Sequence, residues 1–259
     1  MAYDRLLERL CLVDDGWVVK GATALLARGI GVRATIDIDI YRERARELAE
    51  AELREAASRD IGDWFTFELR PGRAVATDAG VRIPLTAYVG MASWAAFHVD
   101  LVGSDLRMNG DPEHVPPLAR VLMPDIEQHG YQAYPLVDHI ADKISATVQR
   151  YSEQGRPSTR FKDLVDLVAI VTEVSVPADL QMAALASEAQ RRGTVMPASF
   201  DVPDRGLWER GYAAEATRSL LATAPTLTEA LGVVRPFVDP LLAGAAVGRW
   251  DPKLGRWAA

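Results

Sequence analysis

Alternation of apolar and acidic residues is clearest at residues 35–40, which read Thr-Ile-Asp-Ile-Asp-Ile. Such alternation predicts a strand. Side chains two positions apart share one face of a strand, so Asp37 and Asp39 point the same way and the isoleucines pack behind them. Two carboxylates roughly 7 Å apart along a strand can bracket one or two hard divalent cations. The pattern therefore indicates a strand that carries a candidate metal site.

The rest of the first hundred residues changes between helical and strand periodicity. Helical spacing is found over residues 3–13, 21–28 and 43–59. Strand-like stretches lie at residues 17–19, 36–41, 64–70, 81–90 and 96–102. This mixture indicates an α/β or α+β fold, with a mixed sheet in the N-terminal lobe.

The pattern changes beyond Pro112. Several prolines predict an irregular linker or crossing segment over residues 111–134. The remainder is almost wholly helical, with helices expected at residues 135–151, 160–174, 177–192, 205–223 and 226–243. We therefore expect a sheet lobe at residues 1–110 and an all-helical lobe at residues 135–259 that completes an active-site cleft.

The composition is that of a soluble globular protein, with 49% apolar and 25% charged residues. No apolar run has membrane-spanning length, and the N-terminus reads as an amphipathic helix rather than a signal peptide. The single cysteine, Cys11, excludes an internal disulfide and fits a reducing compartment. We expect a cytoplasmic protein with no membrane partner.

The formal charge of −7 argues against a surface that is basic throughout, so any contact with nucleic acid has to be local. The most basic stretch runs from Arg150 to Lys162 and includes Arg156 and Arg160. A solvated loop would have the same composition. Charge alone leaves both interpretations open.

Two further features accompany the 36–41 strand. The turn Lys20-Gly21-Ala22-Thr23 offers backbone N–H groups to a phosphate at the start of a helix. Residues 98–102 also alternate, which puts Asp100 on one face of another strand. In one sheet with Asp37 and Asp39, Asp100 would complete a metal triad like those of two-metal sites. An exposed or ion-paired aspartate on an edge strand would give the same pattern.

The helix expected at residues 135–151 has an apolar stripe, with His139, Lys143 and Arg150 along a neighbouring face. An ammonium group near a triphosphate stabilises charge as it moves to the leaving pyrophosphate. Lys143 is therefore a candidate for nucleotide chemistry.

The next helix carries two acidic candidates. Asp163 and Asp166 are three residues apart and share a face, and Lys162 stands four residues before Asp166, where the two can pair. A buried aspartate can orient a catalytic lysine or hold a nucleophilic hydroxyl. A helix surface with ordinary ion pairs has the same sequence, so both interpretations remain open.

Other kinds of site are excluded. The histidines have no metal-ligand spacing, and with one cysteine no zinc site is credible. No P-loop, dinucleotide-binding glycine fingerprint or Ser-His-Asp arrangement is present. Three tryptophans are expected to be packing anchors: Trp208, Trp250 and Trp257.

Three motifs, in this order, resemble the AbiEii/AbiGii-type nucleotidyltransferase toxins, which include the MenT-type toxins and belong to the DNA polymerase β-like nucleotidyltransferase superfamily. The first is KGATAL at residues 20–25 with RATIDID at residues 33–39; the second is DKISA at residues 142–146 with Arg150; the third is RFKDLVDL at residues 160–167. Order and spacing agree over about residues 17–170. Beyond that, the chain is similar to the family only in being helical.

The resemblance implies roles for these residues. Asp37 and Asp39 would bind Mg²⁺ and the nucleotide phosphates, and Asp100 fits the third-carboxylate position. Lys143 matches the lysine that engages the nucleotide, and Asp163 matches the aspartate of the last motif.

The resemblance also assigns neighbouring residues. Asp166 cannot be separated from Asp163 by sequence, and Arg160 of the same motif would be a nucleotide-binding residue. Thr35 lies where the family has a Ser or Thr near the active centre.

Gly21, Ala22 and Thr23 would form the phosphate turn. The family usually has Gly-Gly or Gly-Ser where this chain has Gly-Ala. Alanine adds a methyl group and loses access to positive φ, and Thr23 is a possible replacement donor.

By this resemblance, the protein would transfer a nucleoside monophosphate from an NTP to the 3′ end of tRNA, as the toxin of a type IV toxin–antitoxin pair. A cognate antitoxin would be its partner, and a phosphate on Thr35 would be one means of inhibition. Two alternatives remain: a nucleotidyltransferase acting on a small molecule or a protein hydroxyl, and a non-catalytic nucleotide-binding module.

Overall fold

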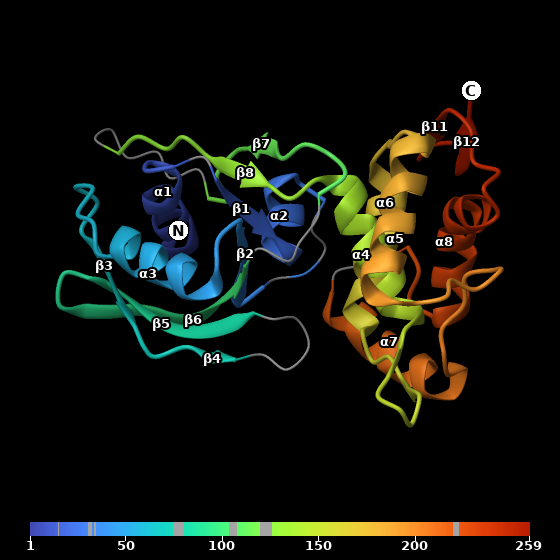
Figure 1. The fold of residues 1–259 in the computed structure, drawn as a ribbon, viewed down its shortest axis with the longest axis horizontal. Coiled ribbons are helices and arrows are strands. Elements are labelled where there is room, and N and C mark those ends of the chain that lie inside the picture. Colours follow the sequence, from blue (N-terminus) through green and yellow to red (C-terminus); the bar gives the residue numbers. More distant parts are fainter. Residues whose placement is uncertain are drawn as a thin grey trace. The chain divides into compact units, whose positions relative to one another are not determined.

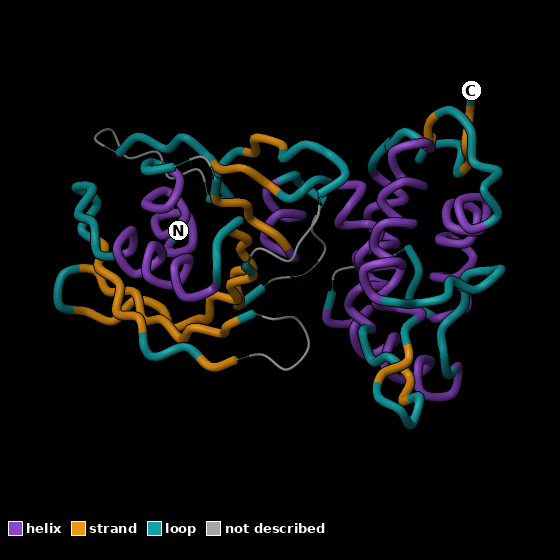
Figure 2. Tube along the Cα trace, viewed as in Figure 1, coloured by secondary structure: helices purple, strands orange, loops and turns teal. Residues whose placement is uncertain are grey.

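In the computed structural model, which describes residues 1–14, 16–30, 33, 35–74, 80–103, 108–119, 126–219 and 223–259, the chain forms two units (Figure 1 and Figure 2). The sheet unit comprises residues 1–29, 35–107 and 112–134. The helical unit comprises residues 135–259 together with two short segments, residues 30–34 and 108–111. The chain therefore enters the helical unit twice before its main helices begin.

The sheet unit has one mixed sheet and three helices. The helices are α1 (Ala2–Cys11), α2 (Gly21–Ala27) and α3 (Arg46–Ala57). The strands are β1 (Trp17–Lys20), β2 (Asp37–Arg42), β3 (Phe65–Leu69), β4 (Arg73–Ala74), β5 (Val81–Val89), β6 (Ala92–Val102), β7 (Glu113–Val115) and β8 (Tyr131–Ala133). The strand order is β3-β5-β6-β2-β1-β8-β7, and β4 also pairs with β5. The pairs β2–β6 and β1–β8 are parallel, and the others are antiparallel.

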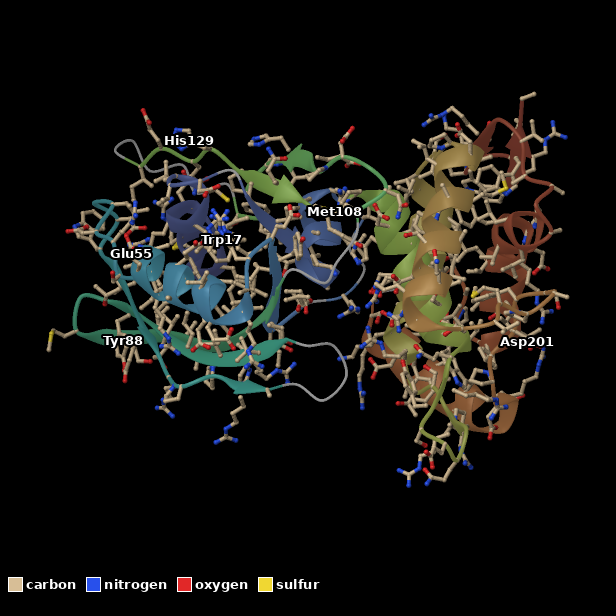
Figure 3. The ribbon with its side chains drawn as sticks, in the orientation of Figure 1. Trp17, Glu55, Tyr88, Met108, His129 and Asp201 are labelled. Atoms are coloured by element: carbon tan, nitrogen blue, oxygen red, sulfur yellow. The ribbon has the colours of Figure 1, made fainter. Side chains whose placement is uncertain are left out.

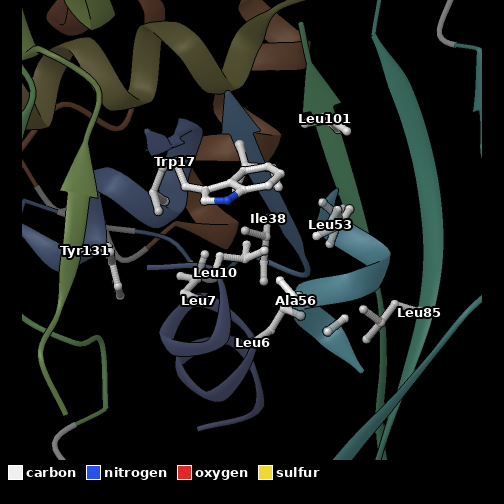
Figure 4. Close-up of a cluster of buried hydrophobic side chains, with 14 of the residues drawn as sticks. Leu6, Leu7, Leu10, Trp17, Ile38, Leu53, Ala56, Leu85, Leu101 and Tyr131 are labelled. Atoms are coloured by element: carbon white, nitrogen blue, oxygen red, sulfur yellow. The ribbon is translucent and has the colours of Figure 1, made fainter. Parts of the chain in front are cut away.

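Alternation along the strands buries one face of this sheet. Val19, Ile40, Leu101 and Val81 stand opposite one another across β1, β2, β6 and β5, and all four are at most 5% exposed. Leucines of α1 and Leu53 of α3 pack against this face (Figure 4). The charged side chains at alternate strand positions consequently project from the other face.

The segment expected to be an irregular linker, residues 111–134, contains two strands. β8 pairs in parallel with β1, and β7 pairs with β8, so the described part of residues 112–134 extends the sheet. Residues 120–125, which include Pro124 of that expected linker, lie outside the described residues. Three-residue strands are too short to show a period of two, which is why the sequence did not reveal them.

The helical unit is built around a buried central helix. Its helices are α4 (Leu136–Val148), α5 (Phe161–Glu173), α6 (Ala178–Arg192), α7 (Arg205–Arg218) and α8 (Leu227–Leu242). Every residue from Leu164 to Val171 of α5 is buried, and α4, α7 and α8 contact this helix. The expectation that this lobe is all-helical is wrong in detail, because it also has two hairpins. These are β9 (Arg150–Tyr151) with β10 (Arg156–Pro157), and β11 (Arg249–Asp251) with β12 (Arg256–Ala258).

Tryptophans anchor the helical unit as expected. The buried indoles of Trp208 and Trp250 donate hydrogen bonds of 2.7 Å to the carbonyls of Ser158 and Val171. Trp257, which is partly buried, donates to a carbonyl of α8 and stacks on Phe237. Each indole therefore has the hydrogen-bond partner that a packed tryptophan requires.

The helices and strands expected from the sequence are all present, with ends that differ by up to five residues. The largest difference is at α7, which ends at Arg218, and residues 220–222 lie outside the described residues. Within the part of the chain that is described, no helix is both long and apolar enough to cross a membrane.

Candidate functional site

The sheet unit brings three of the expected carboxylates together on the face opposite its core. β2 and β6 run parallel, with Asp37 opposite His98 and Asp39 opposite Asp100. Residues in register share a face, so all four side chains project from the same side. Ile38 between the two aspartates of β2 is fully buried on the other side. The sequence-based prediction of one acidic face is therefore confirmed.

Asp100 has an arginine partner that the sequence did not indicate. Nε of Arg82 donates to Oδ1 of Asp100 at 2.7 Å, and Nη2 donates to Oδ2 at 2.6 Å. This bonding to Asp100 raises the pKa of the Arg82 guanidinium, and the charges of Asp37 and Asp39 add to the rise. Both oxygens of the expected third metal ligand are thus engaged by a guanidinium. Among the described residues, no three His, Cys, Asp or Glu side chains are grouped closely enough to hold a metal.

Asp37 is the carboxylate best suited to a cation. Its Oδ1 atom is buried and accepts no hydrogen bond from the described residues, while Nδ1 of His98 lies 3.3 Å away. A buried carboxylate oxygen without a donor is costly unless a cation or water completes its shell. Mg²⁺ commonly uses only one or two protein carboxylates, with waters and substrate phosphates as its other ligands. Asp37 and Asp39 fit that requirement without Asp100.

Gly21 is required by the position of Asp39. Gly21 has φ of +60°, and a Cβ atom built there would lie 1.8 Å from Oδ2 of Asp39. No other residue type avoids both the left-handed backbone strain and this overlap. The turn therefore lies directly against a metal-binding candidate. The positive φ falls on Gly21 and not on Ala22, so the Gly-Ala departure from the family pattern leaves this backbone conformation intact.

Thr23 and Thr35 fix the backbone of Asp37. The hydroxyls of Thr23 and Thr35 donate to the carbonyl oxygen of Asp37, at 3.3 Å and 2.9 Å, and the Thr35 hydroxyl also accepts from the Asp37 amide at 3.3 Å. Thr23 is fully buried. Its hydroxyl is therefore committed to this carbonyl rather than offered to a phosphate as expected.

The helical unit contains the second group of expected residues. Nζ of Lys143 on α4 lies 3.1 Å from Oδ1 of Asp163 and 2.7 Å from Oδ2 of Asp166, both on α5. All three side chains are at most 5% exposed. Burial acts to lower the pKa of Lys143, but the two carboxylates outweigh it and raise that pKa. Lys143 is therefore a stable cation.

Asp166 has a second partner, Arg33, which the spacing of charged residues along the helices did not indicate. Nε and Nη2 of Arg33 donate to the two oxygens of Asp166 at 2.9 Å and 2.8 Å. Burial acts to raise the pKa of Asp166, but Lys143 and Arg33 together hold it at about 2. The expected pairing of Lys162 with Asp166 is wrong, because both oxygens are already taken. Arg33 is 133 residues from Asp166, and its place at the start of the RATIDID motif was the only available signal.

Arg160 completes this cluster at its exposed edge. Its Nε donates to Oδ2 of Asp163 at 2.6 Å, and 55% of its side chain is exposed. The charge of Asp163 raises the pKa of Arg160. Lys143, Arg33 and Arg160 outnumber the two carboxylates by one charge. Arg160 is the cation of this cluster that an anion can reach, and the charge of Asp142 also acts on it.

Arg150 does not belong to this cluster. It lies on the hairpin that follows α4, where Nη1 donates to the Gly155 carbonyl and Nη2 donates to the Pro203 carbonyl. His139 and Lys143 on α4 are buried. The expected common face of His139, Lys143 and Arg150 is therefore wrong, because the helix ends at Val148.

The fold is shared with two solved structures. MenT4, a nucleotidyltransferase toxin from Mycobacterium tuberculosis, superposes with a TM-score of 0.51 at 17% identity, over 94% of this chain and 91% of MenT4. JHP933 from Helicobacter pylori gives a TM-score of 0.50 at 17% identity, over 93% of this chain and 90% of JHP933. At this identity, the likeness concerns the fold alone. No curated protein matches the sequence significantly.

The sequence itself matches a family. Residues 5–233 match the family described as "Nucleotidyl transferase AbiEii toxin, Type IV TA system". This range covers most of the chain and includes both groups of charged residues described above. The chain therefore belongs to the AbiEii family of nucleotidyltransferase toxins of type IV toxin–antitoxin systems.

Proposed function

We propose that this protein transfers a nucleoside monophosphate from an NTP to the 3′ end of tRNA, in the cytoplasm, and that a cognate antitoxin restrains it. The observation that carries the proposal is the contact between Gly21 and Asp39. It puts the glycine turn at the start of α2 against the carboxylate strand, and nucleotide transfer needs both a phosphate cradle and carboxylates for a cation.

Asp37 and Asp39 are the residues that would hold Mg²⁺. When bound, this ion would neutralise charge on the nucleotide phosphates. The hydroxyls of Thr23 and Thr35 keep the Asp37 backbone in place for that task. A phosphate on Thr35 would break its hydrogen bond to Asp37 and bring negative charge beside the carboxylates, which makes Thr35 a suitable point of control for the antitoxin.

The electrostatic part of the proposal depends on four residues of the helical unit: Lys143, Asp163, Asp166 and Arg160. A terminal ribose hydroxyl attacks the α-phosphorus of the NTP, the bond to the bridging oxygen breaks, and pyrophosphate leaves with the negative charge. The hydroxyl proton passes to solvent. Positive charge at Lys143 and Arg160 stabilises the leaving group.

Asp166 is assigned a positioning role rather than that of a base. Its pKa of about 2 keeps it ionised and makes it a poor proton acceptor at neutral pH. Its two oxygens instead fix Lys143 and Arg33. Asp163 is assigned a positioning role from its contacts, because its two oxygens hold Arg160 beside Lys143.

The test is incubation of purified protein with total tRNA, Mg²⁺ and each α-³²P-labelled NTP in turn, with Asp39→Ala as the control. The proposal predicts label on tRNA with wild-type protein only, and the successful NTP identifies the nucleotide. Label on protein or on an added small molecule, with none on tRNA, would replace the proposed acceptor. Binding of NTP without any transfer would leave a nucleotide-binding module.

A further inference from the structure

We propose that three arginines on one face of the sheet, at and beside its β3–β4 edge, form a binding surface for the phosphates of a polynucleotide acceptor: Arg70, Arg73 and Arg82. We call them the arginine edge. The inference rests on the proposed function, because it assigns the surface that holds the RNA while its end is modified. It concerns the sheet unit alone.

Strand register aligns two of these arginines with the acidic centre. Arg73 of β4 is opposite Arg82 of β5, which is opposite Asp100 of β6, which is opposite Asp39 of β2. Residues in register lie on the same face of a sheet. The row of side chains across these four strands therefore begins with two arginines, on β4 and β5, and ends with two aspartates, on β6 and β2.

Arg70 belongs to the adjacent row on this face. Its backbone N–H donates to the carbonyl of Pro84 at 2.9 Å, one position beyond the last pair of β3 and β5. Pro84 is opposite His98, and His98 is opposite Asp37. Both rows thus run from arginine at the β3–β4 side to aspartate on β2. Figure 3 marks this face at Tyr88 of β5, whose side chain extends away from α1 and α3.

The charges of this surface are available to an anion. Arg70 and Arg73 are exposed, and among the described residues neither has an ion-pair partner. Arg82 is 46% exposed and spends Nε and Nη2 on Asp100, which leaves the donors of Nη1. Like charges opposite each other in a sheet are destabilising. The Arg73–Arg82 pair is therefore better explained by a bound anion than by sheet stability.

Hydrogen bonds from α3 also hold the backbone of the arginine edge in place. Arg54 of α3 donates hydrogen bonds to the carbonyls of Leu69 and Arg70, at 3.0 Å and 2.8 Å, and pairs with Glu50. These bonds fix the backbone between β3 and β4, where Arg70 and Arg73 lie. Asp100 fixes Arg82 in the same way. A preorganised set of guanidinium groups loses less entropy when it binds phosphate.

The extent of the surface indicates a polynucleotide rather than the NTP. Strands are about 4.8 Å apart, so Arg73 on β4 lies about 14 Å from Asp39 on β2. A nucleic-acid strand advances about 3.4 Å per phosphate, so about four phosphates cover this distance. A triphosphate at the aspartates ends well before Arg73.

The decisive experiment measures tRNA binding by fluorescence anisotropy without NTP, over a range of salt concentrations. The variants are Arg70→Gln/Arg73→Gln, which leaves the Arg82–Asp100 pair intact, and the triple variant that adds Arg82→Gln. Arg59→Gln is the matched control, because Arg59 is an exposed arginine of the same unit on the α3 side. Melting temperatures check folding, and binding of a fluorescent NTP analogue is measured in parallel.

We expect the double variant to bind tRNA at least about 10-fold more weakly and the slope of log Kd against log salt to fall by about 0.7 per lost phosphate contact. NTP binding by the double variant and tRNA binding by Arg59→Gln should stay within about twofold of wild type. Unchanged tRNA affinity and slope in both variants would overturn the inference, as would a loss confined to NTP binding. If wild-type protein binds no tRNA, the proposed acceptor itself fails, and the inference fails with it.

Discussion

Replacement of Gly21 by alanine tests the contact on which the proposed function depends. The new Cβ atom would lie 1.8 Å from Oδ2 of Asp39, where separations below 3.0 Å are essentially never observed. The carboxylate must therefore move by about 1.2 Å, the difference between these two distances. Displacement of a reacting group by about 1 Å can reduce a rate by about 100-fold. The left-handed φ adds about 1–2 kcal/mol of strain, which corresponds to a fall in Tm of about 2–8 °C.

Gly90→Ala separates these two effects. Gly90 has φ of +57°, close to that of Gly21, but a Cβ atom there meets nothing within 4 Å. Both variants should lose similar thermal stability in differential scanning fluorimetry. Only Gly21→Ala should lose about 100-fold in the initial rate of label transfer. Wild-type activity in Gly21→Ala would refute the claim that the turn and Asp39 form one site, and so would equal loss of activity in both variants.

Three further predictions concern the helical unit. Asp138→Ala removes the acceptor of three hydrogen bonds from Asn109 and Gly110. The free energy of unfolding measured by urea titration should therefore fall by about 1–3 kcal/mol. An unchanged value would show that these bonds are dispensable. Lys143→Met leaves the buried carboxylates of Asp163 and Asp166 with one cation fewer. The free energy of unfolding should fall by about 3 kcal/mol and transfer activity should be lost, whereas full activity would remove Lys143 from the mechanism. The pKa of Asp166 falls on folding from 3.8 to about 2, so its contribution, about 2 kcal/mol, is complete above pH 4 and is lost as the pH falls toward 2. The unfolding free energy of Asp166→Asn should therefore depend less steeply on pH in that window than that of wild type, and equal slopes would contradict the assignment.

The carboxylate strand could be predicted from the sequence because its information is local. Alternation fixes which side chains share a face, and Ile38 and Ile40 are buried as the pattern predicts. The expectation fails at Ile36, which precedes β2 and is 72% exposed. Spacing along a helix likewise put Asp163 and Asp166 together, and both reach Lys143. In each case, the two aspartates lie on one strand or one helix, so local spacing is enough to predict that they share a face.

Partners that come from distant parts of the chain could not be predicted in this way. Arg82 reaches Asp100 because β5 and β6 form a hairpin with a particular register, and a one-residue change in that register would put Arg82 on the opposite face. Arg33 reaches Asp166 across 133 residues through a short segment that groups with the helical unit. No periodicity encodes such pairings, and the sequence marked Arg33 only as the first residue of the RATIDID motif.

The central claim, transfer of a nucleotide to the 3′ end of tRNA, is tested most directly with two forms of one substrate. Wild-type protein and the α-³²P-labelled NTP are incubated with intact tRNA and with tRNA whose terminal 2′,3′-diol has been oxidised by periodate. The account predicts label on intact tRNA and none on the oxidised form, because the attacking hydroxyl has been destroyed. Equal labelling of both forms, or labelling of neither, would contradict it.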